Sequence, residues 1–180
     1  MARAKWALLA VGVIATLAGT GFVAQGGWRS DGPSGQPIAF PHDVHAGTLQ
    51  IPCMYCHYTA DRSPAAGIPS VQTCAGCHMP GTMPGQPAVP VVRPDAPGVQ
   101  QLAQYWQQGV PIPWVRIHDL PDHVHFPHMM HVNAGLDCQE CHGPVETMRE
   151  VEQVSSLQMG WCIDCHKQRD VRVDCFICHY

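Results

Sequence analysis

All ten cysteines of this 180-residue chain occur in one arrangement that can attach a metal cofactor covalently. They form pairs with two residues between them, and histidine directly follows each pair. In chain order the five Cys-x-x-Cys-His motifs are Cys53/Cys56/His57, Cys74/Cys77/His78, Cys138/Cys141/His142, Cys162/Cys165/His166 and Cys175/Cys178/His179. This motif is the attachment signature of c-type haem, in which two thiols hold one porphyrin and the adjacent imidazole binds its iron. The sequence therefore predicts five covalently bound c-type haems.

Other uses of paired cysteines fit this pattern less well. Zinc ribbons need pairs of such pairs, and five is an odd number. A disulfide framework does not require a histidine after every second cysteine. A thioredoxin-like redox motif would occur once, near a βαβ pattern.

Seven histidines remain outside the motifs, and a low-spin haem needs a second axial ligand such as histidine or methionine. Four of the seven lie in a repeat, Phe-Pro-His-x-x-His, which precedes the first and third motifs. We predict these four as distal iron ligands: His42, His45, His128 and His131. Two histidines three apart on a short helix project from neighbouring faces, so each can reach a different iron.

The fifth distal ligand is less defined by the pattern. His118 is the first choice by elimination, and we predict it as a metal ligand. His123 and His125 alternate along an extended segment, which favours contact with solvent or with other ligands. Met148 and Met159 are weaker alternatives, because methionine more often fills cores. A methionine ligand would raise the potential of its haem above that of bis-histidine neighbours.

The N-terminus predicts a membrane anchor over residues 1–25. Trp6–Ala24 contains no charged residue, and at helical rise it spans roughly 28 Å, close to the hydrocarbon thickness of a bilayer. A cleaved signal peptide would have a shorter apolar region and a better small-residue cleavage site. Arg3 and Lys5 predict a cytoplasmic N-terminus. We therefore expect a single-pass protein of the cytoplasmic (inner) membrane, with its haems on the periplasmic, outer face.

Composition indicates how the rest of the chain is built. Glycine and proline number 17 each, which disfavours long helices or a large sheet. With roughly thirty residues per haem, the porphyrins must supply most of the buried apolar surface. The formal net charge of −4 argues against a nucleic-acid partner. The predicted fold is that of a multihaem cytochrome c, mostly irregular, with short α-helices wrapped around the haems and one N-terminal transmembrane helix.

Five segments follow from these features. After the anchor come a linker (26–38), a two-haem segment (39–79), a Pro/Gly-rich connector with a short helix (80–109) and a three-haem segment (110–180). The short helix is expected to end at Gly109, with Val99, Leu102, Ala103 and Trp106 on one face. A second helix is expected over Pro144–Val154, with proline near its start.

The repeat before the first and third motifs resembles that of the class III cytochromes, the c3/c7 group. In that group the first histidine of the repeat ligates the haem of the following motif, and the second reaches another haem. The resemblance therefore implies that His42 serves the first motif and His128 the third. It implies that His45 and His131 bind other haems.

A broader resemblance covers most of the chain. The runs Ile112–Pro121, Phe126–Gly135, Cys138–Gly143 and Met159–His166 resemble the pentahaem subunit of alternative complex III. This family implies a quinol-oxidising membrane complex of respiration or photosynthesis, with an iron–sulfur protein, polytopic quinol-binding subunits and a monohaem cytochrome c as partners. It implies transfer to a soluble cytochrome c, a small copper protein or a terminal oxidase. The Met159-Gly-Trp stretch also occurs in multihaem subunits of other molybdopterin-type oxidoreductase complexes.

These features favour a non-catalytic electron-transfer subunit, with quinol oxidation carried by other subunits and no catalytic residue in this chain. Three alternatives remain. One is an electron-transfer subunit of another molybdopterin-type complex, and another is a stand-alone multihaem quinol dehydrogenase. The third is a haem enzyme, which would need an iron with an open coordination position.

Overall fold

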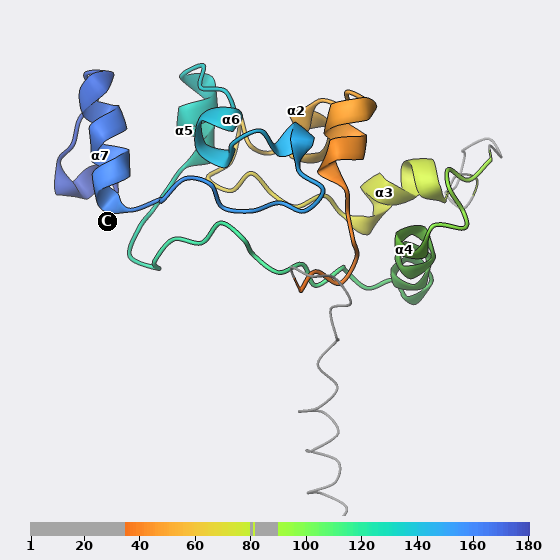
Figure 1. Ribbon diagram of the computed structural model, residues 1–180. Coiled ribbons are helices and arrows are strands. Elements are labelled where there is room, and N and C mark those ends of the chain that lie inside the picture. Colours follow the sequence, from red (N-terminus) through yellow and green to blue (C-terminus); the bar gives the residue numbers. More distant parts are fainter. Residues whose placement is uncertain (1–34, 80, 82–89) are drawn as a thin grey trace, which may run out of the picture.

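The computed structural model describes residues 35–79, 81 and 90–180, and these residues form short helices joined by irregular segments, without strands (Figure 1). Before the connector lie η1 (Asp43–Thr48, a π-helix), α2 (Cys53–Cys56) and α3 (Val71–His78). The longest helix is α4 (Pro97–Gln108). The remaining elements are α5 (His128–Asn133), α6 (Gln139–His142), the 3-10 helix η2 (Val145–Thr147), α7 (Met159–Gln168) and the 3-10 helix η3 (Cys175–Ile177).

Helix α4 confirms the short helix predicted before Gly109. The helix begins at Pro97, where the missing amide hydrogen of proline would have had no partner inside the helix. It ends at Gly109, whose φ of 66° gives the left-handed cap that glycine adopts most readily. The buried face differs from the expectation, because Tyr105 is buried while Ala103 and Trp106 are only partly covered.

The prediction of a helix over Pro144–Val154 is wrong beyond the first turn. Only η2 forms there, and the chain then continues without regular structure. The backbone of this segment is engaged elsewhere: the Met148 carbonyl accepts the Asp43 amide at 2.9 Å. The Glu146 carbonyl lies so close to Gly47 that a Cβ there would clash with it. Packing of η2 against η1 therefore replaces the continuation of a helix.

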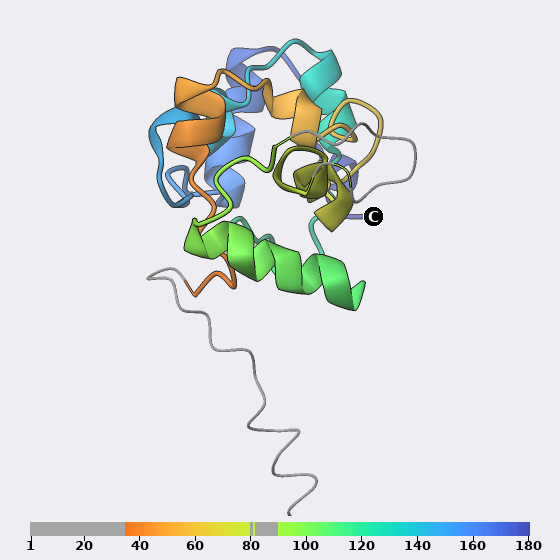
Figure 2. The ribbon, with the colours of Figure 1, turned by 90° about the vertical axis from the view of Figure 1, so that its right-hand side faces the viewer.

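The helices that carry the motifs succeed one another along the molecule (Figure 1). From one end to the other they follow the order α3, α2, α6 and α7, with the C-terminus beside α7. Helix α4 lies under α3 in both views and contacts it (Figures 1 and 2). The order in space therefore differs from the order in the chain, because α3 follows α2 in sequence but lies outside it.

Side chains pack on one another mainly at the α4 end. There a small core of Ile38, Leu102, Tyr105 and Ile112 contacts partly buried Val71 and Trp114. Elsewhere, large apolar side chains within the motifs are open, such as Tyr55 and Phe176, which are 58% and 80% exposed. A protein with so little internal core suits the prediction that apolar porphyrins complete its interior.

The predicted anchor over residues 1–25 lies outside the described residues, as does most of the linker. Within the part of the chain that the structure describes, no helix has the length and apolar character to cross a bilayer.

Candidate haem sites

Four of the five motif histidines are held by backbone carbonyls through one ring nitrogen. The Nδ1 atoms of His57, His78, His166 and His179 lie 2.7 to 2.9 Å from the carbonyls of Gly67, Val92, Arg172 and His123, respectively. A proton on Nδ1 leaves the lone pair on Nε2, which fixes the tautomer that binds a metal. The polypeptide's own hydrogen bonds therefore hold these four side chains in the tautomer that can bind iron.

Three of the predicted distal histidines are prepared in the same way. His45 and His131 each bond the carbonyl of a proline four residues earlier, at 2.9 and 3.0 Å. His128 bonds the Pro64 carbonyl at 2.9 Å through Nδ1. Their Nε2 atoms are thus also available to a metal.

Three pairs of these rings stand at the separation that one iron between them requires. The ring centroids are 6.2 Å apart for His45 and His78, 6.4 Å for His128 and His142, and 6.1 Å for His131 and His166. With metal–imidazole bonds of about 2 Å, two rings opposite each other on one metal have centroids roughly 6 Å apart. The residues at the second, third and fourth motifs therefore fit bis-histidine haem.

The remaining histidine of the repeat, His42, belongs with His57 of the first motif. Burial, followed by the nearby charges of His57 and His45, lowers the pKa of His42 to about 4. Its Nδ1 is buried and has no hydrogen-bond partner. The neutral imidazole that a metal requires is thus the stable form of His42. This placement agrees with the resemblance, which implied that His42 serves the first motif.

The two copies of the sequence repeat have one geometry. Phe40 contacts His42 edge-on at 4.8 Å and stacks on His45 at 4.3 Å, while Phe126 contacts His128 edge-on at 4.9 Å and stacks on His131 at 4.2 Å. In each copy the first histidine faces its own motif and the second faces the next motif in the chain. We call these two-motif units the first module (motifs one and two) and the second module (motifs three and four).

Thiols that lie near one another show which motifs are neighbours in space, both inside the first module and between the two modules. Burial, and then the thiol of Cys77, raises the pKa of Cys56. The first and second motifs are therefore adjacent. Burial, and then the thiol of Cys53, raises the pKa of Cys138. The modules thus meet through the first and third motifs.

The second module continues the same sequence of contacts. Burial, and then the thiol of Cys165, raises the pKa of Cys141, which places the third motif beside the fourth. Burial, and then the thiol of Cys178, raises the pKa of Cys162, which places the fourth beside the fifth. The motifs therefore form a row in the order second, first, third, fourth and fifth. The arrangement of α3, α2, α6 and α7 in Figure 1 agrees.

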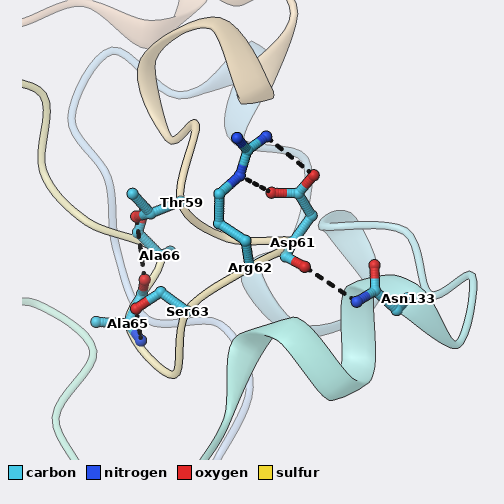
Figure 3. Close-up of polar contacts among 7 residues, drawn as sticks. All are labelled: Thr59, Asp61, Arg62, Ser63, Ala65, Ala66 and Asn133. Atoms are coloured by element: carbon cyan, nitrogen blue, oxygen red, sulfur yellow. Dashed lines mark hydrogen bonds and ion pairs between the residues drawn. The ribbon is translucent and has the colours of Figure 1, made fainter.

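A loop that we call the connecting loop, residues 59–67, ties the two modules together. Its Gly67 carbonyl holds His57 of the first module, and its Pro64 carbonyl accepts both Nδ1 and the backbone amide of His128 in the second. Asn133 of α5 donates to the Asp61 carbonyl at 2.9 Å (Figure 3). One loop thus positions a candidate iron ligand in each of the two modules.

Thr59 shapes this loop from within. Its hydroxyl lies 3.1 and 2.7 Å from the carbonyls of Ala65 and Ala66 (Figure 3). Gly67 follows with a φ of 78°, and a Cβ there would lie 2.6 Å from the Thr59 hydroxyl oxygen. Sequence reasoning missed this loop, although its proline and glycine indicated a turn.

Thr59→Val is expected to loosen the connecting loop and lower the free energy of unfolding by about 1–2 kcal/mol, since it removes hydrogen bonds to two carbonyls. Thermal unfolding of the haem-loaded protein measures this change. Thr73→Val is a matched control, because among the described residues the Thr73 hydroxyl is hydrogen-bonded only to the Ser70 hydroxyl, at 3.5 Å. An equal loss in both variants would contradict a special role for the loop.

The three histidines outside the repeat lie at two different motifs. The ring of His118, the predicted fifth ligand, contacts His142 edge-on at 4.4 Å, and burial lowers its pKa. Burial, followed by the charges of His118, His128 and His57, lowers the pKa of His142 to about 4. His123 and His125 both lie against the fifth motif. The structure therefore places His118 at the third motif and not beside His179.

Comparison with known proteins agrees with this geometry. Residues 124–180 match the family described as cytochrome c7 and related cytochrome c. These residues carry the second repeat and the last three motifs, so this part of the chain is a c7-like multihaem cytochrome domain that binds c-type haem.

A curated relative extends the likeness over more of the chain. The multihaem cytochrome c subunit of menaquinone reductase from Nitratidesulfovibrio vulgaris is 32% identical over 107 residues. The match covers 59% of this chain and 45% of the relative, so the chain spans less than half of that protein's length.

Proposed function

We propose that this chain is a membrane-anchored pentahaem cytochrome c that relays single electrons within a quinone-linked membrane complex. The observation that carries the proposal is the row of five motifs with histidines paired across it. When bound, c-type haem supplies reversible one-electron chemistry at its iron. The chain's residues position the irons, through paired imidazoles whose Nδ1 atoms are fixed by backbone carbonyls.

We place the complex in the class that oxidises quinol and passes electrons to a periplasmic acceptor, as in alternative complex III. The resemblance of the four runs between Ile112 and His166 supports this assignment. The expected partners are an iron–sulfur protein, polytopic quinol-binding subunits and a monohaem cytochrome c, with quinol oxidation carried by those other subunits. Residues 1–25 would anchor the chain in the cytoplasmic membrane, with residues 39–180 outside.

A second candidate reverses the direction of electron flow. The curated relative is named as a subunit of menaquinone reductase. By that likeness the chain would deliver electrons toward quinone instead of accepting them from quinol. The same row of haems serves either direction, because a relay of reversible one-electron carriers has no built-in direction.

The test is to extract the chain from membranes with mild detergent and to identify the copurified subunits by mass spectrometry. We expect release only with detergent, five haems on the chain and polytopic quinone-binding partners. Addition of menaquinol to the oxidised complex should reduce the haems under the first candidate. Reduced complex that is oxidised by menaquinone, without reduction by menaquinol, would favour the second. A chain that is released by salt alone, without partners, would contradict both.

A further inference from the structure

We propose that the iron bound by His179 lacks a second histidine ligand from this chain, and that its sixth position takes a small haem ligand from solution, such as imidazole. The inference rests on the proposed five-haem relay and concerns the last haem of the row. It departs from the expectation that every iron has two protein ligands.

The histidines can be accounted for completely, because all twelve lie among the described residues. Six of them form three facing pairs at the second, third and fourth motifs, and His42 lies near His57 of the first motif. His179 is the ninth, which leaves three histidines that could face it: His118, His123 and His125.

His118 lies at a different motif. Its ring is 4.4 Å from the ring of His142 and nearly perpendicular to it, at 78°. That separation is too short for two ligands opposite each other on one metal, which need roughly 6 Å. The position opposite His142 is taken by His128, at 6.4 Å. His118 is therefore a neighbour of the third motif.

His123 is excluded by the way it holds His179. Its backbone carbonyl accepts from Nδ1 of His179 at 2.8 Å. The two nitrogens of an imidazole point in nearly opposite directions, so the His123 carbonyl lies on the far side of the ring from the iron-binding Nε2. The His123 ring is tied to that carbonyl by a few bonds and stacks beside His179 at 5.5 Å and 22°. It cannot also stand opposite Nε2.

His125 is held on the same side by the next backbone contact. Its amide donates to the Cys178 carbonyl at 2.8 Å, and its ring stacks on Tyr180 at 4.4 Å. Residues 123–125 therefore run along the peptide that carries the fifth motif. Among the described residues, the His125 ring therefore contacts Tyr180 and not the ring of His179.

The place of this haem in the row makes the open position accessible. The fifth motif is at one end of the row. Among the neighbouring thiols described above, its Cys178 lies near Cys162 of the fourth motif. Phe176 and Tyr180 beside it are 80% and 74% exposed. The opposite end of the row, at the second motif, is covered by α4 and has the complete pair of His45 and His78.

The experiment uses the full chain, loaded with haem and purified in detergent. Intact mass first gives the number of haems, and fewer than five would contradict the proposed function. Electron paramagnetic resonance and near-infrared magnetic circular dichroism of the ferric protein then give the fraction of bis-histidine haem. We expect four of five haems with that signature, and uptake of about one imidazole per chain that brings the fifth to it.

Variants assign the open position. Cys175→Ser combined with Cys178→Ser removes the fifth haem, so imidazole uptake should be lost while four bis-histidine haems remain. His123→Ala should leave the native count at four of five, and His131→Ala should lower it to three. Five bis-histidine haems in the native chain would overturn this inference alone. A methionine-ligated fifth haem that takes up no imidazole would overturn it as well.

Discussion

Replacing Cys138 and Cys141 together by serine is expected to divide the row of haems into two halves that no longer exchange electrons. The third motif is where the modules meet, since Cys138 lies near Cys53 and Cys141 lies near Cys165. Loss of its haem should leave four haems per chain and reduce electron exchange between the halves to background. The variant should also lose several kcal/mol of stability, because a porphyrin buries a large apolar surface, at about 25 cal/mol per Å².

Haem count by intact mass and stopped-flow reduction of the proposed complex measure this effect. A reductant that enters at one end should reduce only the haems of that half rapidly, which gives a biphasic trace. The matched control is Cys175→Ser with Cys178→Ser, which also removes one haem but at the end of the row. The four haems of that control should still be reduced in one connected process. Rapid reduction of all haems in the Cys138/Cys141 variant would contradict the proposed order.

His45→Ala and His131→Ala are each expected to convert one haem, one fifth of the total, from low-spin to high-spin. The affected haems should be those of His78 and His166, which stand 6.2 and 6.1 Å from the replaced rings. Because the two sites are in separate modules, the double variant should show the sum of the single effects. Ferric electron paramagnetic resonance measures the number of high-spin haems.

A cycle of variants identifies which haem each histidine serves. In a chain without the second haem (Cys74→Ser with Cys77→Ser), His45→Ala should add no further high-spin signal. In a chain without the first haem (Cys53→Ser with Cys56→Ser), it should still add one. The reverse result would assign His45 to the first motif and would contradict the pairing across motifs.

The covalent sites follow from local sequence, and so does part of the ligand set. A Cys-x-x-Cys-His motif needs only one turn of chain, and the four repeat histidines lie beside the motifs that they were predicted to serve or reach. Helix α4 was also predictable, because its stop at Gly109 is local. Such features depend on neighbours in sequence, which a single chain displays directly.

Other features depend on contacts between distant segments. The motif histidines that His45 and His131 face are determined by how each module folds. No local sequence pattern shows which motif each of them reaches. The carbonyls of Pro64 and Gly67 hold the histidines only because the connecting loop turns back toward His57 and His128. The helix expected after Pro144 fails because η1 takes its backbone contacts. His118 was chosen by elimination among the possible axial ligands, and no local pattern showed which motif it faces.

The connecting loop also governs how this molecule can come apart. The same few residues hold His57 in one module and His128 in the other, and Asn133 adds a further bond across them. Separation of the modules therefore requires release of the support of these histidines, together with loss of the packing of η2 against η1. Unfolding and loss of native iron coordination at the centre of the row should occur together, as one cooperative transition at one temperature.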